Sequence, residues 1–467
     1  MGSGIVVILK NFAPLTLYLS GLVFAIIAMS GRVRWALMLA VFLLPLRNVI
    51  EKIQIYPFAN QFIDILLIGV IIGGLTSKKG GDKTKSSINT IALITVIYLL
   101  LSVIRGSFYL YGSFYFDIHD SRIQDWKNFA LLPLLFFLNF KNNVNKKDIW
   151  ITFAVMCFSM FLVDYYTINQ IKDHPSLSGR ELVHGTFQFL GPNEVAAFFN
   201  EYTIIAMSVF YVVKKGRNKW LLLIMILANL YCIMFLYSRG AYAGLIMGMF
   251  ILFTLKDKKM LIPLFLVLAL WQTVLPQNVV DRIKETKTEA GQLDQSSQRR
   301  IDIWQQAFSY FKSNPIVGIG FGSFRHLGLD LGDTHNIYVK TLTEQGIIGF
   351  IILLITFFCF IKEGWILYQK GDDELSKALG LGFVCCIFTM IVNNCFGDRW
   401  SYLEPNAYLW IFAGLVARLN VISRNPLKSP SLALPTKGEG IIGTPYKKGR
   451  NSGLNPKKKI RYYDPPT

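Results

Sequence analysis

Asn314-Pro315-Ile316-Val317-Gly318-Ile319-Gly320-Phe321-Gly322, followed by His335-Asn336, lies in the longest hydrophilic interval of this 467-residue chain, from about Asp281 to Phe350. An apolar run to about Ile361 follows, and the interval also holds the pair Arg299-Arg300. Because nearly all of the remaining chain consists of apolar runs, we expect this interval to form a partly helical loop that caps a site at a membrane surface.

The composition indicates a membrane protein. Hydrophobic residues make up 53% of the chain, charged residues only 16%, and the mean hydropathy is +0.42. A soluble protein of this length needs more charge on its surface. A β-barrel would show short alternating segments, whereas this chain shows runs of about 18 apolar residues, the length that crosses a bilayer as a helix. No cleavable signal peptide is expected at the first run.

The apolar runs predict an all-α fold, a polytopic transmembrane bundle of about 12–13 spans with one large extracytoplasmic, partly helical loop. We expect four parts: transmembrane helices over 1–275, the loop with an amphipathic helix over 276–336, transmembrane helices over 337–422, and a disordered basic cytoplasmic tail over 423–467. The runs lie near 12–30, 35–50, 62–76, 89–104, 128–140, 149–165, 195–213, 220–237, 240–255, 260–275, 337–361, 378–396 and 405–420.

Charge sets the expected orientation. Basic loops occur at Ser77–Lys85, Lys141–Lys147, Lys214–Lys219 and Lys256–Lys259, and the positive-inside rule places them in the cytoplasm. The formal net charge of +19 follows from these loops and the tail, so it does not indicate nucleic-acid binding. The six cysteines lack metal-ligand spacing and are expected to pack inside or beside apolar runs: Cys157, Cys232, Cys359, Cys385, Cys386 and Cys395.

Several arginines fall at the expected outer ends of spans: Arg105, Arg122, Arg180 and Arg239. An arginine there must snorkel to water, pair, or line a polar cavity. Snorkelling accounts equally well for Arg105, but Arg239 lies in a tight bend between two apolar helices, beside Ser238 and Gly240. Guanidinium groups suit phosphate oxygens, so an outward pocket lined by arginines indicates a phosphorylated or pyrophosphorylated lipid ligand.

Gly191-Pro192-Asn193 breaks the chain just before an apolar run, and we expect Asn193 to cap the helix that follows. Two interpretations fit this pattern. It could simply start the helix, or the positive end of the helix could face an anionic headgroup.

The long loop carries a helical pattern and a candidate base. Ile301, Trp304 and Phe308 follow Arg300 at spacings of three and four, which predicts an amphipathic helix. The glycines after it lack the Lys-Ser/Thr of a P-loop, so we exclude nucleotide binding. His335 has a side chain that can exchange a proton near neutral pH. Alternatively, Asp330, Asp333 and His335 could bind a metal, although the flexible loop makes this weak evidence.

The chain resembles the O-antigen ligase/O-antigen polymerase superfamily of bacterial membrane glycosyltransferases. Its ligases carry His, then Asn, Ser or Gln, nine residues, Gly, two residues, and Gly, Thr or Tyr. Here the motif reads His335-Asn336, nine residues, Gly346, Ile347-Ile348 and Gly349. Similar stretches are Gly185 to Ala197, Ser238-Arg239-Gly240, and Arg300 to Trp304 leading to Asn314-Pro315, so the resemblance covers about residues 180–360.

The resemblance implies a multi-pass protein of the bacterial inner (cytoplasmic) membrane with its active site facing the periplasm or exterior. Its partners would be a glycan linked to undecaprenyl pyrophosphate, a glycan or glycolipid acceptor, and membrane lipids. Such ligases use no nucleotide sugar and no metal, so we expect no cofactor. The family's catalytic arginines fall on Arg180 and Arg239, and a further arginine falls on Arg122 or Arg105.

These observations yield a mechanistic hypothesis. Arg180 and Arg239 hold the pyrophosphate, His335 positions or deprotonates the acceptor hydroxyl, and transfer inverts the anomeric centre. The expected substrate-binding residues are Arg122, Arg105, Asn193, Arg300 and Asn336. A polymerase that joins lipid-linked repeat units is the alternative within this class, and a transporter or flippase for an anionic lipid or solute is the alternative outside it.

Overall fold

A computed structural model describes residues 2–76, 86–117, 119–285, 295–328 and 332–424. Its described residues belong to one compact unit, Met1–Ser429. The tail expected over 423–467 lies outside the described residues except for its first two, which end the last helix. The basic loop at Ser77–Lys85 lies outside them as well, and so does Asp330.

The described residues form helices and no strands, so the all-α prediction is confirmed. The α-helices are α1 (Gly2–Met29), α2 (Arg34–Leu43), α3 (Arg47–Glu51), α4 (Phe62–Thr76), α5 (Ser87–Tyr111), α6 (Ser121–Asn142), α7 (Lys146–Asp173), α8 (Pro192–Phe210), α9 (Arg217–Phe235), α10 (Arg239–Lys256), α11 (Leu261–Ala269), α12 (Trp271–Val274), α13 (Gln277–Lys284), α14 (Gln295–Ser313), α15 (Ile337–Lys370), α16 (Glu374–Asn393) and α17 (Leu403–Arg424). Short 3₁₀ helices are η1 (Ala59–Gln61), η2 (Ser178–Leu182), η3 (Lys258–Met260) and η4 (Phe324–His326).

In the described part of the chain, nine helices are long and apolar enough to cross a membrane. They are α1, α4 with the preceding η1, α5, α7, α9, α10, α15, α16 and α17. The polytopic prediction is therefore confirmed. The other four apolar runs fall into two groups. Two correspond to α6 and α8, which carry more polar residues. The other two, near 35–50 and 260–275, are each interrupted, into α2 and α3 and into α11 and α12. Pro45 separates α2 from α3, because proline lacks the backbone N–H that a continuing helix needs.

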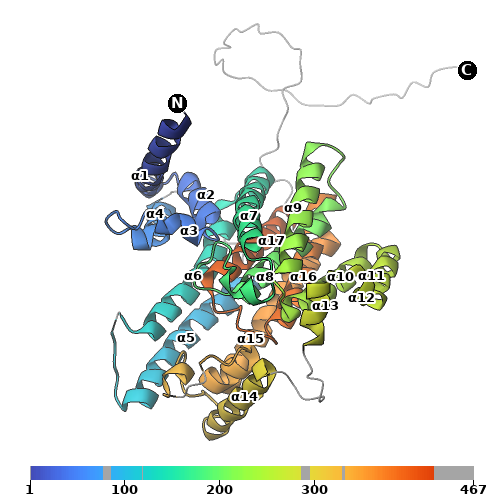
Figure 1. The fold of residues 1–467 in the computed structure, drawn as a ribbon. Coiled ribbons are helices and arrows are strands. Elements are labelled where there is room, and N and C mark those ends of the chain that lie inside the picture. The colour runs from blue at the N-terminus through green and yellow to red at the C-terminus, as the bar shows by residue number, and fades with distance from the viewer. Residues whose placement is uncertain (1, 77–85, 118, 286–294, 329–331, 425–467) are drawn as a thin grey trace, which may run out of the picture. The chain divides into compact units, whose positions relative to one another are not determined.

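The most buried helices lie at the centre of the bundle. Figure 1 shows α8, α16 and α17 there, with α1 and α4 at one edge and α11 and α12 at the opposite edge. The apolar window of α17 is 89% buried and that of α16 is 72% buried, whereas that of α1 is 17% buried. A helix that is apolar all round and central is covered by other helices, and the peripheral apolar helices expose their faces to lipid.

Helix α15 is broken at Gly346, and the Gly-rich segment 314–322 docks against the break. Gly346 has φ 66° and ψ −166°, which is not helical. Four backbone hydrogen bonds join the two segments: Ile319 N donates to Thr343 O (3.0 Å), Gly320 N to Glu344 O (2.8 Å), Ile347 N to Pro315 O (2.9 Å), and Ile348 N to Ile316 O (3.3 Å). The docked segment thus satisfies backbone groups that the break leaves without helical partners.

Glycine is required at the two closest points of this contact. A Cβ atom at Gly346 would lie 2.3 Å from the Ile316 carbonyl oxygen, and one at Gly318 would lie 2.4 Å from the Glu344 carbonyl carbon. Both glycines also have positive φ, which side chains disfavour. The glycines therefore allow close backbone contact, and the segment they form is held rigidly.

The amphipathic helix expected in the long loop is present as α14. Ile303 and Ala307 are buried against Ile319, Phe324 and Val339, whereas Phe308 is 40% exposed. The protein-facing side of α14 therefore lies at Ile303 and Ala307, and Phe308 remains accessible. Trp304 also turns inward, since its indole N–H donates to the Thr334 carbonyl (2.8 Å).

Replacing Gly346 with alanine is expected to release the docked segment. The backbone conformation at this position is almost exclusive to glycine and costs other residues about 1–3 kcal/mol, and the added methyl group would overlap the Ile316 carbonyl. We expect a lower apparent melting temperature in detergent and faster proteolysis of α14. The matched control is Gly74→Ala, where the nearest atom lies 4.0 Å from the added Cβ. Equal melting of the two variants would contradict the proposed docking.

Candidate functional site

Two arginines converge on one backbone carbonyl. Arg180 in η2 donates from Nη1 to Tyr237 O (2.8 Å), and Arg282 in α13 donates from Nε to the same oxygen (3.3 Å). Tyr237 precedes α10 and has φ 52°, an unusual conformation for tyrosine, which aims its carbonyl away from the helix. Each guanidinium carries five N–H donors, so one shared carbonyl leaves most of them for other acceptors.

A third arginine, Arg239, lies in the same electrostatic environment at the first residue of α10. Burial lowers the pKa of Arg180; Glu181 raises it, and the cations Arg282 and Arg239 lower it further. Arg180 is only 4% exposed. We call Arg180, Arg239 and Arg282 the arginine group. Three cations held together repel one another, and this arrangement favours a bound anion with more than one charge.

Helix α8 begins beside the arginine group. The Asn193 side-chain oxygen accepts a hydrogen bond from Arg180 Nη2 (3.1 Å). The expectation that Asn193 caps α8 was wrong: Gly191 is the N-cap and Pro192 is the first helical residue. Proline fits that position because its missing N–H has no helical partner there. The start of α8 therefore has no side-chain cap, and Asn193 is left to orient Arg180.

The next residue, Glu194, connects the arginine group to His335. Its carboxylate pairs with Arg399 (3.2 Å), which precedes α17 and is 4% exposed. Both Glu194 and Arg399 act electrostatically on the His335 imidazole. Adjacent residues have Cα atoms about 3.8 Å apart, so the first turn of α8 touches both halves of the site. We call Arg180, Arg239, Arg282, Asn193, Glu194, Arg399 and His335 the site.

His335 is held in an uncommon conformation just before α15. Its φ is 49° and its side chain is exposed. Asn336 fixes the following turn, because its side-chain oxygen accepts from Tyr338 N (2.9 Å) and Val339 N (3.1 Å) and its amide donates to Cys395 O (3.1 Å). Asn336 thus caps α15, and its contacts support a role in positioning His335.

The surroundings of His335 favour a neutral imidazole. Desolvation by the neighbouring chain lowers its pKa below the ordinary 6.5; Asp333 and Glu194 raise it, and Arg300 and Arg399 lower it. Arg300, which we predicted to bind substrate, therefore lies within electrostatic range of His335. A neutral imidazole can accept a proton at neutral pH.

Asp333 completes the setting of His335. Burial acts to raise the pKa of Asp333, but Lys340 and His335 outweigh it and hold the pKa below its usual value. The Lys340 ammonium lies 2.7 Å from Asp398 and 3.7 Å from Asp333. An ionised carboxylate beside the histidine would stabilise an imidazolium that forms during a reaction. Within the described residues no group of three or more histidine, cysteine or acidic side chains could hold a metal ion.

Arg122 and Arg105 contact a different part of the molecule. Arg122 is fully buried, pairs with Asp120 (2.5 Å) and lies over the Tyr111 ring (5.1 Å). Arg105 donates to Asn314 (3.0 Å). These partners belong to α5, the start of α6 and the end of α14, and they explain both arginines as supports for the docked segment. Their predicted role in substrate binding stays a prediction.

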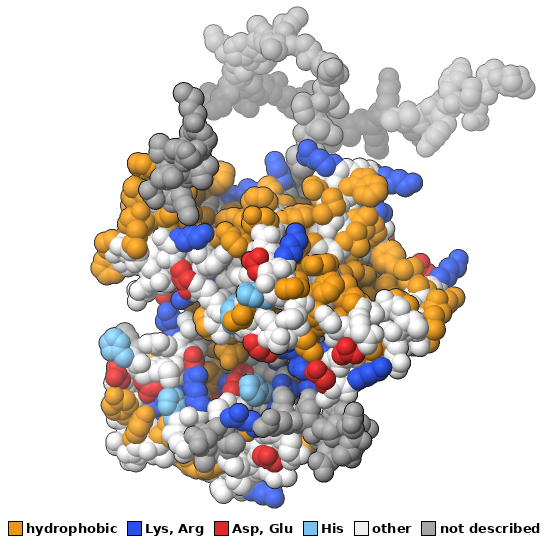
Figure 2. Space-filling model, in the orientation of Figure 1, with side chains coloured by type: hydrophobic (Ala, Val, Ile, Leu, Met, Phe, Trp, Pro, Cys, Tyr) orange, Lys and Arg blue, Asp and Glu red, His pale blue; other side chains and the backbone are white. Residues whose placement is uncertain are grey.

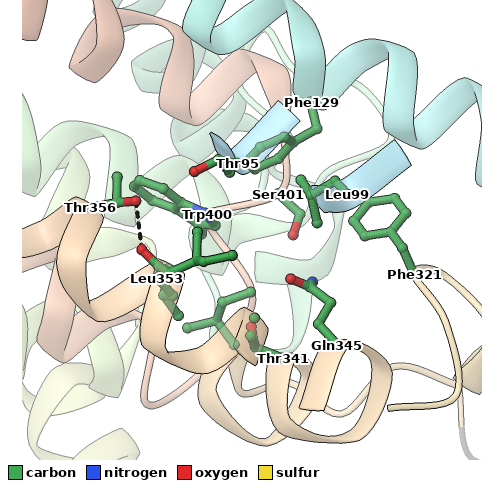
Figure 3. Close-up of a pocket in the computed structure, with 13 residues that line it drawn as sticks. Thr95, Leu99, Phe129, Phe321, Thr341, Gln345, Leu353, Thr356, Trp400 and Ser401 are labelled. Atoms are coloured by element: carbon green, nitrogen blue, oxygen red, sulfur yellow. Dashed lines mark hydrogen bonds between the residues drawn. The ribbon is translucent and has the colours of Figure 1, made fainter. Parts of the chain in front are cut away.

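A small, partly open cavity lies between α5, α6, α15 and the segment before α17 (Figure 3). Apolar side chains such as Leu99, Phe129 and Leu353 form most of its wall, and Gln345 and Thr341 contribute polar groups. The site residues do not line it. Figure 2 shows instead a crevice between the surface over α14 and the surface over α8 and α13, along which positive and negative side chains gather.

The comparisons with known proteins find one family for part of the chain. Residues 220–354 match the family model described as O-antigen ligase. This match supports the resemblance to the O-antigen ligase/polymerase superfamily. A protein of Haemophilus influenzae (strain ATCC 51907 / DSM 11121 / KW20 / Rd), described as uncharacterized, is 25% identical over 201 residues, which is 36% of this chain. The match spans about half the length of that relative.

The matched O-antigen ligase region contains Arg239, Arg282, Arg300 and His335, whereas Arg180 precedes it. The shared Tyr237 carbonyl brings Arg180 to this region. Sequence reasoning missed Arg282 and Arg399. Arg282 lies in the long loop and Arg399 in the outward loop before α17, but nothing in the sequence singles them out from the 48 lysines and arginines of the chain.

The pKa of His335 can be measured directly by NMR titration of protein with labelled histidine. We expect a value below 6.5, because desolvation and the nearby cations disfavour the imidazolium. Arg300→Gln should raise this pKa by removing a cation, and Asp333→Asn should lower it by removing an anion. His335→Asn identifies the signal, since asparagine tolerates positive φ. Shifts of the opposite sign would contradict this electrostatic description.

Proposed function

We propose that this protein transfers a glycan from undecaprenyl pyrophosphate to an acceptor hydroxyl, as an O-antigen ligase, at the extracytoplasmic face of a bacterial inner membrane. One observation carries the proposal: the arginine group and His335 meet at the two sides of the first turn of α8. The match to the family supports glycan transfer in general, and the motif at His335–Gly349 favours a ligase over a polymerase.

The arginine group would hold the pyrophosphate. As the bond between the anomeric carbon and the phosphate oxygen breaks, negative charge grows on the leaving pyrophosphate. Guanidinium donors already aimed at one place stabilise this charge without reorganising. The start of α8, which has no side-chain cap, adds positive backbone dipole at the same place.

His335 would receive the proton of the acceptor hydroxyl as the new bond to the anomeric carbon forms. Attack from the side opposite the pyrophosphate inverts the configuration of that carbon. Asp333 would stabilise the resulting imidazolium, and desolvation, helped by Arg300, would keep the resting imidazole neutral by lowering its pKa. The proton then leaves to solvent or to the departing pyrophosphate, which resets His335.

Helix α14 would cover the acceptor side of the site. Trp304 ties α14 to the segment that carries His335, and Ile303 and Ala307 anchor it on α15. A cover at this position limits the access of water, which would otherwise hydrolyse the donor. A transporter is supported less well, because the site residues lie at helix ends and in loops, whereas alternating access needs binding groups near the membrane midplane.

Substitutions in the arginine group and at His335 test the chemistry in reconstituted liposomes. Arg239→Ala or Arg282→Ala should each reduce transfer by about 10²–10³-fold through loss of charge stabilisation. His335→Asn should reduce it by a similar factor through loss of the base. Arg217→Ala, which removes an exposed arginine at the start of α9, is the matched control. The proposal fails if the site variants retain transfer equal to that of Arg217→Ala.

Deletion of the gene separates ligase from polymerase. A cell that lacks a ligase still polymerises its glycan, so we expect full-length glycan to accumulate on undecaprenyl pyrophosphate. A cell that lacks a polymerase would accumulate single repeat units instead. Mass spectrometry of the extracted lipid-linked glycans measures the difference, and complementation with His335→Asn is the control for loss of activity without loss of the protein.

A further inference from the structure

A group of exposed aromatic side chains follows the last turns of α5. They are Phe108, Tyr111, Phe114, Tyr115 and Phe116, and their exposed fractions lie between 45% and 63%. Tyr111 and Tyr115 contact each other edge to face, with ring centroids 5.1 Å apart. We call these five residues the aromatic shelf.

Two members of the aromatic shelf, Tyr111 and Tyr115, are held in place by neighbouring residues. The Arg122 guanidinium lies over the Tyr111 ring (5.1 Å), and the Ser107 hydroxyl donates to the Tyr115 carbonyl (2.9 Å). Arg122 is itself fixed by the ion pair with Asp120. Ring faces that are exposed and also held still bind a flat ligand with a smaller entropic cost than mobile side chains would.

Polar groups surround the aromatic shelf. Asp117 accepts from the Tyr115 hydroxyl (3.2 Å) and from His119 N (2.8 Å). On the facing η4, His326 shares a hydrogen bond with Ser121 (3.1 Å). Aromatic faces beside carboxylate and imidazole groups suit a sugar, because the C–H face of a pyranose packs on a ring while its hydroxyls donate to carboxylates.

The position of the aromatic shelf argues against the alternative that these residues are an aromatic belt, which anchors a membrane protein at the membrane–water interface. Tyr111 lies six residues beyond Arg105 on α5, or about 9 Å farther along the helix axis. The Asp117 carboxylate lies beside the shelf, and a carboxylate repels the anionic headgroups that a belt would meet. Uncharged hydroxyl groups meet no such repulsion.

A continuous set of contacts connects the aromatic shelf to His335. The Glu344 carboxylate on α15 accepts from Gly322 N (3.0 Å) and Phe324 N (3.2 Å), which fixes η4 to the helix that His335 precedes. Phe321 N donates to Ser102 O (3.1 Å), which fixes the same segment to α5. The aromatic shelf and His335 are therefore connected through the contacts among α5, η4 and α15.

We propose that the aromatic shelf binds the sugars of the acceptor glycan. This inference rests on the proposed transfer function. The arginine group, on η2, α10 and α13, holds the donor pyrophosphate on one side of His335, and the shelf is connected to His335 through a different set of elements. An acceptor whose hydroxyl reaches His335 and whose further sugars extend away from the pyrophosphate would lie on the shelf.

The test compares Phe116→Ala with Phe358→Ala, which removes an equally exposed aromatic ring (63% in both) from the apolar surface of α15. The probe is a set of oligosaccharides released by mild acid from the surface glycan of the source cells. We expect Phe116→Ala to raise the KM for the acceptor about tenfold and to leave kcat and the KM for the donor unchanged. Phe358→Ala should change none of these constants.

Four outcomes overturn the proposal or separate it from the proposed function. A raised donor KM in Phe116→Ala would place the donor glycan on the shelf, and equal effects of the two substitutions would indicate a general role of aromatic residues at the lipid interface. Saturation-transfer NMR with the same oligosaccharides tests the shelf separately from catalysis. If wild-type protein binds the oligosaccharides through Phe116 but transfers no glycan, the proposed transfer function is wrong and the proposed sugar binding by the shelf is supported. If transfer occurs without such binding, only the proposal for the shelf is wrong.

Discussion

The backbone pairing between the broken helix α15 and the segment 315–320 is the constraint on which the site depends. A break inside a helix leaves carbonyl and N–H groups without partners, and near a membrane such groups cost several kcal/mol each. Here the carbonyls of Thr343 and Glu344 and the N–H groups of Ile347 and Ile348 find partners in the docked segment. The segment cannot leave without exposing them again. Since α14 precedes the segment and His335 follows it, this contact fixes the chain on both sides of the segment.

The second constraint is electrostatic. Arg180, Arg239 and Arg282 come from three elements that are far apart in the sequence, and the elements meet where helices end and the chain turns. At such turns backbone carbonyls are available, so Tyr237 O can hold two guanidinium groups at once. The acidic neighbours Glu181 and Glu285 offset only part of the positive charge. A phosphate-rich ligand would supply the rest, which explains why these cations can be kept together.

The sequence predicted the helical class because apolar runs of about 18 residues match the length of a membrane-crossing helix and exceed that of an ordinary strand. The resemblance to the family predicted roles for His335, Arg239 and Arg180. The start of α8 was placed two residues late, at Asn193, because asparagine is a common cap and the effect of Pro192 was underweighted. The spacing of Ile301, Trp304 and Phe308 predicted an amphipathic helix, but hydrophobicity alone does not show that close packing of α14 uses the small residue Ala307. Arg282 and Arg399 become recognisable only through their partners, Tyr237 O and Glu194. Tertiary contacts of this kind leave no periodic signal in a single sequence.

The spacing of the motif has a physical meaning in this structure. Asn336 caps α15, and Gly346 is the point where the docked segment enters, so the nine residues between them form the helical segment that separates His335 from the docking contact. At about 1.5 Å per residue this segment is about 14 Å long. One residue more or fewer would rotate Gly346 by about 100° around the helix and turn the break away from the segment that it must meet. Gly349, one turn later, brings the same helix close to Tyr98 of α5. The motif therefore encodes the position of His335 relative to a fixed backbone contact.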